Sequence, residues 1–497
     1  MPKNNYDVVI GLEIHFESKT KSKMFCSCLN DSNEEIPNTN ICPICTGHPG
    51  TLPVINKQAI DNIIKTGLAL NCSISELTKF DRKNYFYPDL PKGYQISQFD
   101  LPICHNGYLV IKDRGGEKKE VRINRIHQEE DTGRLSHGED GLSLIDFNRA
   151  GVPLMELVTE PDIFSKEEAV NFAKELQLVL KYLEVSDANM EKGEMRVEVN
   201  LSLKKKGEEV LGTKVEIKNL NSFKSVEKAI EYEIERQSEI LDDGGSILQE
   251  TRGWHDQKQV TMSQREKEDS FEYRYFPEPD LPPLEISLEQ IEKMRCLIPE
   301  LPEDKRLRFQ EEYAFKEGDL LEIFIENKDF ARYFEEVATE TGNWMESNNI
   351  PRENFFELLK LSVNYLTSDL LGMAQGGPQY FGEKITPENF AEFINLIYKG
   401  DISSKIAKIV LKEMYEKNKD PSQIIEDEGL KQIDNEGEIL NIIDQVIKMH
   451  PDPVKDYKKG KDASFQFLIG QAMALSKGKA NPQKLKEILQ ERLDNLS

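Results

Sequence analysis

Apolar and polar residues alternate with a period of two in three segments of the first half of the chain. The segments are residues 7–17, 195–203 and 214–218, and the first has apolar side chains at Val8, Ile10, Leu12, Ile14 and Phe16. Such alternation predicts β-strands that turn one face toward a core. Their other face is rich in carboxylates, His, Arg and Asn, which favours a functional concave sheet. The alternative is an antiparallel sheet whose polar face is exposed to solvent and has no further role.

Helical periodicity appears between and after these strands. Ser165 and Glu168 form a capping-box signature in front of an apolar stripe that ends at Leu183. A second helix is expected over about 225–241, and helical periodicity dominates beyond the proline-rich stretch 277–283. The pattern therefore predicts an α+β first part followed by an all-helical part.

The composition narrows the class of protein. The 497 residues suffice for two to four domains at roughly 100–200 residues each. Lys and Arg number 64 against 89 Asp and Glu, and the formal charge of −25 argues against a protein that coats nucleic acid through bulk charge. No apolar run is long enough to span a membrane, and the N-terminus lacks signal-peptide features. We expect a soluble cytoplasmic protein with neither a membrane nor DNA as a partner.

Four of the seven cysteines form two close pairs. Cys26-Ser-Cys28 and Cys42-Pro-Ile-Cys45 flank a polar linker, and four thiolates on short turns are a ligand set of tetrahedral zinc. Because four thiolates fill the coordination shell, we predict a structural rather than a catalytic zinc ion. A redox pair and four unligated thiols are the alternatives. We expect the isolated cysteines to be core residues: Cys72, Cys104 and Cys296.

A second candidate site is rich in oxygen ligands. Glu13 and His15 are two residues apart on one predicted strand and therefore share a face. Glu129 or Glu130, together with Glu156, are candidates to complete the site. Carboxylates with one imidazole suit Mg²⁺ or Mn²⁺ better than zinc, and a satisfied polar cluster is the alternative. The sequence has no P-loop, so we expect any nucleoside triphosphate to be held in another way. It has no Gly-x-Ser-x-Gly elbow either, so it predicts no self-contained amide-hydrolysing nucleophile.

The end of the chain is locally basic. Residues 451–497 hold nine Lys or Arg against six Asp or Glu, within an acidic protein. Such a patch positions phosphates without reading bases. A solvated helix face is the alternative.

Long blocks of the chain resemble one family, the B subunit of the tRNA-dependent amidotransferase (GatB/GatE). The blocks are residues 10–15, the four cysteines with 47–50, then 81–98, 146–160, 218–223, 273–281, 467–473 and 478–482. They are spread over nearly the whole chain. Uninterrupted blocks of this length are far more specific than any short motif.

The resemblance implies a cradle-like antiparallel sheet domain with a zinc knuckle over residues 1–295. An all-helical domain over 296–410 and a small YqeY-like, tRNA-binding tail over 411–497 follow. The implied enzyme is a carbon–nitrogen ligase that uses ATP to phosphorylate the side-chain carboxylate of Glu-tRNA(Gln), Asp-tRNA(Asn) or both. Amination then gives Gln-tRNA(Gln) or Asn-tRNA(Asn). The implied partners, in a heterotrimer, are the amidase of the complex, which supplies ammonia from glutamine, and a small third protein.

The resemblance also assigns residues. It places Mg²⁺ on Glu13, His15, Glu130 and Glu156, with Glu129 as the alternate third ligand. The positive charges of Arg149, Arg196, Lys214 and Lys218, considered apart from the resemblance, suit these residues to offset the charge of phosphate or of the product. We therefore predict catalytic roles for Arg149, Arg196 and Lys218, and contacts to ATP for Lys214, Lys218 and Arg196. Ordinary surface ion pairs are the alternative for these basic residues. Glu198 stands where the family has Asp, which leaves a direct role for this carboxylate open.

Two other classes of function stay open. One is a non-catalytic zinc-knuckle scaffold that binds RNA, and the other is a freestanding metal-dependent hydrolase that uses Glu13 and His15. The scaffold predicts no ATP turnover, whereas the hydrolase predicts activity from this chain alone.

Overall fold

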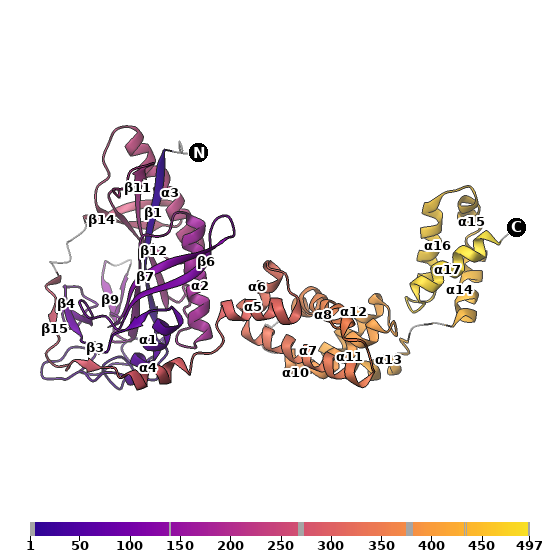
Figure 1. Cartoon of the computed structure of the whole chain (residues 1–497), viewed down its shortest axis with the longest axis horizontal. Helices are drawn as coiled ribbons and strands as arrows, with labels where there is room; N and C mark the ends of the chain where they lie inside the picture. Colours follow the sequence, from indigo (N-terminus) through magenta and orange to yellow (C-terminus); the bar gives the residue numbers. More distant parts are fainter. Residues whose placement is uncertain are drawn as a thin grey trace. The chain divides into compact units, whose positions relative to one another are not determined.

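The computed structural model describes residues 5–138, 141–266, 273–373, 381–431, 433 and 435–495. The chain separates into two compact units, residues 1–304 and 305–497 (Figure 1). The strands of the described residues all lie in the first unit, and the second unit is helical. The predicted order of an α+β part before an all-helical part is confirmed.

A nine-stranded sheet forms the centre of the first unit. Its order is β14 (Val260–Glu266), β13 (Glu250–His255), β12 (Val215–Leu220), β11 (Met195–Lys205), β1 (Tyr6–Glu17), β10 (Pro153–Thr159), β7 (Lys118–Glu130), β6 (Cys104–Lys112) and β2 (Ser73–Ile74). Neighbouring strands are antiparallel except β12 and β13. Those two are parallel because helix α3 (Phe223–Asp242) carries the chain between them. The expected antiparallel sheet therefore contains one parallel pair.

The alternation predicted for the strands is confirmed in β1. Ile10, Ile14 and Phe16 are fully buried, whereas Glu13 and His15 lie half-buried on the opposite face. β11 repeats the pattern over most of its length. In β12 the apolar Val215 and Ile217 are buried, but Glu216 is buried as well, so only the residue types alternate there. The sheet thus has one apolar and one polar face.

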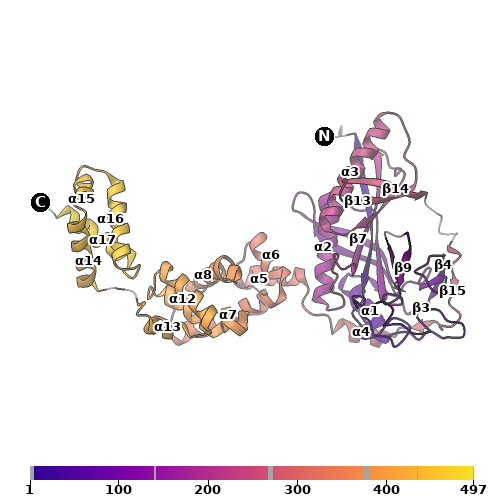
Figure 2. The ribbon, with the colours of Figure 1, turned by 180° about the vertical axis from the view of Figure 1, so that it is seen from behind.

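Three helices cover the apolar face. The buried residues of α1 (Lys57–Ala69), α2 (Lys166–Tyr182) and α3 share one core with the inward residues of the strands, and α2 runs along the sheet (Figure 1, Figure 2). The predicted cap of α2 forms. The backbone N–H of Glu168 donates to Ser165 Oγ at 3.1 Å, and the Glu168 carboxylate accepts from the N–H of Phe164 at 3.0 Å.

Small sheets lie on the other side of the large sheet from α2 (Figure 1, Figure 2). They pair β15 (Phe276–Pro277), β4 (Asp81–Asn84) and β5 (Tyr94–Ser97), then β16 (Leu284–Glu285) with β3 (Leu77–Thr78), and β8 (Arg134–His137) with β9 (Ser143–Asp146). Strand β5 contacts β7 directly, since the Ser97 hydroxyl donates to Glu129 at 3.1 Å. We use the term bowl for the polar face of the large sheet together with the small sheets beside it.

The first unit ends slightly beyond the expected boundary at residue 295. Helix α4 (Leu288–Arg295) packs against α1, and the Gln290 amide donates to Asp61 at 3.2 Å. Ile291 and Met294 belong to the core of the first unit. The chain after α4 therefore leaves this unit only near residue 304.

The second unit contains a short 3₁₀-helix (η2, Arg352–Asn354), a π-helical segment (η3, Leu366–Leu370) and the remaining α-helices, of which the first begins at Pro302, just before the unit boundary. They are α5 (Pro302–Tyr313), α6 (Asp319–Glu326), α7 (Lys328–Ser347), α8 (Phe355–Tyr365), α9 (Leu371–Met373), α10 (Phe381–Lys384), α11 (Pro387–Tyr398), α12 (Ser404–Lys417), α13 (Pro421–Asp427), α14 (Glu436–Met449), α15 (Pro451–Lys458), α16 (Asp462–Leu475) and α17 (Pro482–Asp494). Helix α12 runs across the expected boundary at 410/411, and a separate apolar core begins only at Ile439 in α14. None of the helices in the described residues is long and apolar enough to cross a bilayer.

Candidate functional site

Polar side chains from three adjacent strands meet on the floor of the bowl. β1 contributes His15, β10 contributes Glu156, and β7 contributes His127 and Glu129. The strand register sets His15 opposite Glu156, and Glu156 opposite His127. Because directly opposite side chains are close neighbours, these residues form one row across the sheet.

The donor atoms of this carboxylate–imidazole cluster lie close together. His15 Nε2 is 3.2 Å from Glu156 Oε2 and 3.6 Å from Glu129 Oε1. His127 Nε2 is 3.4 Å from Glu156 Oε2 and 3.8 Å from Glu129 Oε2. Donor atoms of Glu13, His15 and Glu156 lie within 4.8 Å of one another. The structure thus brings together Glu13, His15 and Glu156 as predicted.

Burial and neighbouring charges shift the pKa values of the cluster in opposite directions: the pKa of Glu156 falls, and those of His15 and Glu13 rise. Burial alone would raise the pKa of Glu156, but the charges and hydrogen bonds of His127 and His15 hold that pKa well below its ordinary value. Burial would lower the pKa of His15, yet its hydrogen bond to Glu156 and the surrounding carboxylates raise that pKa to about 9. The pKa of Glu13 rises to about 7 because of burial and of the charges on Glu156 and Glu198. Ionised carboxylates and a protonated imidazole therefore coexist near neutral pH.

Adjacent residues of a strand point to opposite faces, which decides between Glu129 and Glu130. Glu129 faces His15. Glu130 points the other way, where its carboxylate accepts from the Lys92 ammonium and from the backbone N–H of Ile96 at 3.0 Å. Of the two candidates for the third ligand, the structure therefore places the alternate, Glu129, on the face of the cluster and Glu130 away from it, because the alternation of the strand selects the face.

A second group of carboxylates adjoins the cluster. Donor atoms of Glu13, Glu198 on β11 and Glu216 on β12 lie within 4.8 Å of one another. Lys218 Nζ lies 2.8 Å from Glu198 Oε2 and 3.2 Å from Glu216 Oε1. Burial opposes its charge, but the two carboxylates raise the pKa of Lys218, so the ammonium stays protonated. The structure thus brings Lys218 beside the cluster, whereas Lys214 is exposed just before β12.

Arg149 and Arg196 converge on one carboxylate. Arg149 Nε lies 3.2 Å and an Arg196 guanidinium nitrogen 2.8 Å from Asp131 Oδ2. Burial alone would raise the pKa of Asp131, but the two guanidinium groups hold it below its ordinary value. Arg196 faces His15 across the strand pair, and its side chain is 36% exposed. Burial and the charge of Asp131 raise the pKa of the neighbouring Glu17 to about 7.

Two residues of the site escape the sequence-based prediction. His127 lies two positions before Glu129, a period-two spacing that was available as a signal, and its Nδ1 is buried with no hydrogen-bond partner among the described residues. Lys83 comes from β4, and its Nζ lies 5.1 Å from the ring centre of Tyr273. Burial opposes its charge, but the Glu129 carboxylate helps to raise its pKa well above the ordinary value. No local pattern marks Lys83, because a different sheet brings it to the bowl.

The four paired cysteines form a separate cluster, as predicted. The Sγ atoms of Cys26, Cys28, Cys42 and Cys45 lie within 4.8 Å of one another, and all four thiols are free. Four sulfur donors at this spacing fit a tetrahedral zinc ion. Among the isolated cysteines, Cys72 and Cys104 are buried as expected, whereas Cys296 is exposed. That expectation is corrected because Cys296 caps the end of α4 at the surface.

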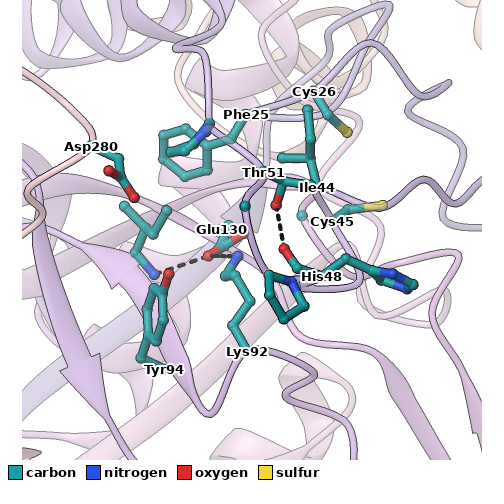
Figure 3. A pocket seen from close by; sticks show the side chains of 16 residues that line it. Phe25, Cys26, Ile44, Cys45, His48, Thr51, Lys92, Tyr94, Glu130 and Asp280 are labelled. Carbon is teal, nitrogen blue, oxygen red and sulfur yellow. Dashed lines mark hydrogen bonds and ion pairs between the residues drawn. The ribbon is translucent and has the colours of Figure 1, made fainter.

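A cavity of about 200 Å³ lies beside the cysteine cluster. Its lining includes Cys45, Lys92 and Glu130, and Figure 3 shows the last two side chains paired in its wall. On another side the Thr51 hydroxyl donates to the carbonyl of His48 at 2.8 Å (Figure 3). Glu130 therefore lines this cavity and not the carboxylate–imidazole cluster.

The region that holds the sheet, its polar floor and the cysteine cluster matches a known class of catalytic domain. The GatB/GatE catalytic domain matches residues 8–292, and the GatB domain matches residues 333–493. The chain belongs to the GatB/GatE family.

Relatives are similar over their full length. The B subunit of the aspartyl/glutamyl-tRNA(Asn/Gln) amidotransferase from Caldicellulosiruptor bescii is 49% identical over 99% of this chain and 100% of that protein. The proteins of the same name from Thermoanaerobacter pseudethanolicus and Brevibacillus brevis are 47% and 46% identical. These matches cover 98% and 99% of this chain, and 99% and 100% of the relatives.

Proposed function

We propose that this chain is the component of a tRNA-dependent amidotransferase that activates and aminates the side-chain carboxylate of Glu-tRNA(Gln), Asp-tRNA(Asn) or both. The observation that carries the proposal is the carboxylate–imidazole cluster of His15, Glu129 and Glu156 in a chain of this family. The relatives' name supplies the substrate class. The fold alone would not identify the substrate class, because one fold serves many reactions.

The reaction follows from the poor electrophilicity of a carboxylate. Transfer of the terminal phosphoryl group of ATP to a carboxylate oxygen gives ADP and an acyl phosphate, which has a good leaving group. The lone pair of neutral ammonia then attacks the acyl carbon, the bond to phosphate breaks, and an amide and phosphate result. The nitrogen loses a proton in this step, which water or a carboxylate of the site accepts.

The cluster fits a hard divalent ion. Its donors are carboxylate oxygens and imidazole, and the lowered pKa values keep Glu129 and Glu156 ionised as ligands. Glu13, His15 and Glu156, together with Glu129, would hold Mg²⁺ or Mn²⁺. His15 would first release the proton that its raised pKa retains in the metal-free cluster, because only the neutral imidazole is a ligand. Such an ion, when bound, offsets charge on a phosphoryl group.

The basic residues of the floor would position phosphate oxygens of ATP. Lys218 and Arg196 present their charges next to the cluster, and Arg149 shares Asp131 with Arg196. Lys214 is four residues before Lys218 and lies exposed just before β12. Lys218, Arg196 and Arg149 each contact a carboxylate as well. These contacts hold their side chains in place before the substrate arrives.

The proposed assembly is a heterotrimer. The amidase of the complex supplies ammonia from glutamine, a small third protein completes the assembly, and a structural zinc ion occupies the four cysteines. The basic tail contacts the phosphates of aminoacylated tRNA. Since charged tRNA is the substrate, we propose the cytoplasm as the compartment.

Glu13→Ala and His15→Ala test the proposal in the reconstituted heterotrimer. We expect each to lower the formation of Gln-tRNA and Asn-tRNA by about 100-fold or more, as for loss of a group that acts in the transition state. Binding of the amidase should not change. Thin-layer chromatography of the digested tRNA measures the product, and Glu191→Ala, at an exposed position, is the control.

The reactions that the wild-type protein catalyses distinguish the proposed amidotransferase from a scaffold and from a hydrolase. Phosphate release from ATP that requires misacylated tRNA and Mg²⁺ supports the proposal. No ATP cleavage would indicate a scaffold, and hydrolytic activity from this chain alone, without the amidase or added ammonia, would indicate a freestanding hydrolase. Full activity in both variants would refute the assignment of the cluster.

A further inference from the structure

Lys23 carries an ammonium group into the interior next to the cysteine cluster. Its side chain is fully buried. Its Nζ lies 3.9 Å from Cys45 Sγ and donates to the carbonyl of Phe147 at 3.3 Å. Within the described part of the chain, no carboxylate forms an ion pair with it. A buried ammonium is costly unless a negative charge compensates it, so the interior must supply one.

The cysteine cluster is the source of that charge. Four thiolates around one Zn²⁺ leave two excess negative charges, whereas four neutral thiols leave none. The nearest group of opposite charge to Lys23 is then the sulfur of Cys45. A hydrogen bond to a thiolate sulfur withdraws electron density from it, as the outer contacts of metal ligands do.

We propose that Lys23 is the buried counter-charge of the zinc–thiolate centre and donates a hydrogen bond to Cys45 Sγ. This inference rests on the zinc ion proposed above. Lys23 is a positioning residue, since it acts on the ion through a ligand.

The backbone around Lys23 ties the cysteine cluster to the floor of the bowl. The N–H of Lys23 donates to the carbonyl of Cys28 at 3.0 Å, and the N–H of Met24 donates to the carbonyl of Gly151 at 2.8 Å. The N–H of Gly151 donates in turn to the carbonyl of Asp131 at 2.9 Å.

Gly151 leaves room for this arrangement. Its φ is +86°, and a Cβ there would lie 3.3 Å from the Cβ of Cys45 and 3.6 Å from Cδ of Lys23. The counter-charge therefore lies in the short stretch that links the zinc centre to Asp131, the residue that holds Arg149 and Arg196.

The test compares Lys23→Met with Lys21→Met in the full-length protein. Lys23→Met removes the charge and keeps a similar volume, and Lys21 is exposed two residues earlier. Elemental analysis gives the zinc content, and a chromogenic chelator follows the rate of zinc release. Cobalt(II) substitution gives the thiolate-to-metal charge-transfer band. We expect wild type and Lys21→Met to hold one zinc ion with equal release rates.

Lys23→Met should bind zinc about 10–100-fold more weakly and release it faster. Its cobalt charge-transfer band should move to lower energy, because the thiolate loses the hydrogen bond and the nearby positive charge. A structural effect of lost packing alone would not move this band. If Lys23→Met does not fold, Lys23→Gln removes the charge and keeps a donor, and it should still speed zinc release.

The outcomes separate the two proposals. Wild-type protein without zinc overturns the zinc assignment and this inference with it. Wild-type protein with zinc, together with unchanged release and an unchanged cobalt band in the neutral variants, overturns only the role of Lys23.

Discussion

At the scale of the residue, the direction of a side chain decides its chemistry. Glu129 and Glu130 have the same charge and adjacent positions, yet Glu129 faces His15 while Glu130 pairs with Lys92 beside the cysteine cluster. The alternation of a strand separates them onto different faces.

Glu129→Gln and Glu130→Gln form a matched pair that tests this separation. Glu129→Gln should weaken Mn²⁺ binding at least tenfold, because a neutral amide replaces an ionised ligand in an oxygen-rich site. Glu130→Gln should bind Mn²⁺ as the wild type does. Electron paramagnetic resonance of free Mn²⁺ during titration measures both. Loss of binding in Glu130→Gln alone would reverse the assignment.

At the scale of the element, close packing fixes how α1 lies on the sheet. Gly67 of α1 faces β6, and a Cβ at this position would lie 2.4 Å from the Sγ of Cys104. Cys104 is fully buried, so its sulfur has little room to move. The helix can approach the strand this closely only with glycine there.

Gly67→Ala should destabilise the protein by about 1–3 kcal/mol through overpacking. Helix propensity alone predicts the opposite sign, since alanine favours a helix by about 1 kcal/mol over glycine. The double variant Gly67→Ala with Cys104→Ala removes the clash and should recover part of the loss. Thermal unfolding followed by circular dichroism measures each variant. A stabilised single variant would contradict the packing argument.

At the scale of the whole molecule, charge is unevenly distributed. The chain carries −25, yet exposed lysines gather in the last helices, among them Lys459 and Lys486. These helices have their own apolar core around Ile443, Leu468 and Leu489. A small folded part with this charge suits contact with tRNA phosphates.

Lys459→Gln and Lys486→Gln should each weaken tRNA binding and lower the slope of log affinity against log salt by about one. Lys57→Gln on α1, whose side chain is 80% exposed, is the control and should change neither. Filter binding of labelled tRNA at several salt concentrations measures the slope. Equal slopes in all variants would exclude the tail as a phosphate contact.

The amino-acid sequence by itself determined the elements with a strong local pattern. The alternation in β1, the cap of α2 and the spacing of the four cysteines are local, because they depend on backbone geometry within a few residues. The prediction of Glu13, His15 and Glu156 as neighbours also followed from strand faces and the resemblance.

Only the tertiary structure decided which distant groups meet. Glu129 instead of Glu130, the addition of Lys83 from a second sheet, and the burial of Lys23 against Cys45 all depend on strand register and on packing between elements. Parallel pairing of β12 with β13 likewise depends on a helix that crosses between them. A single sequence encodes such contacts through many weak interactions at once, and no short pattern in it records them.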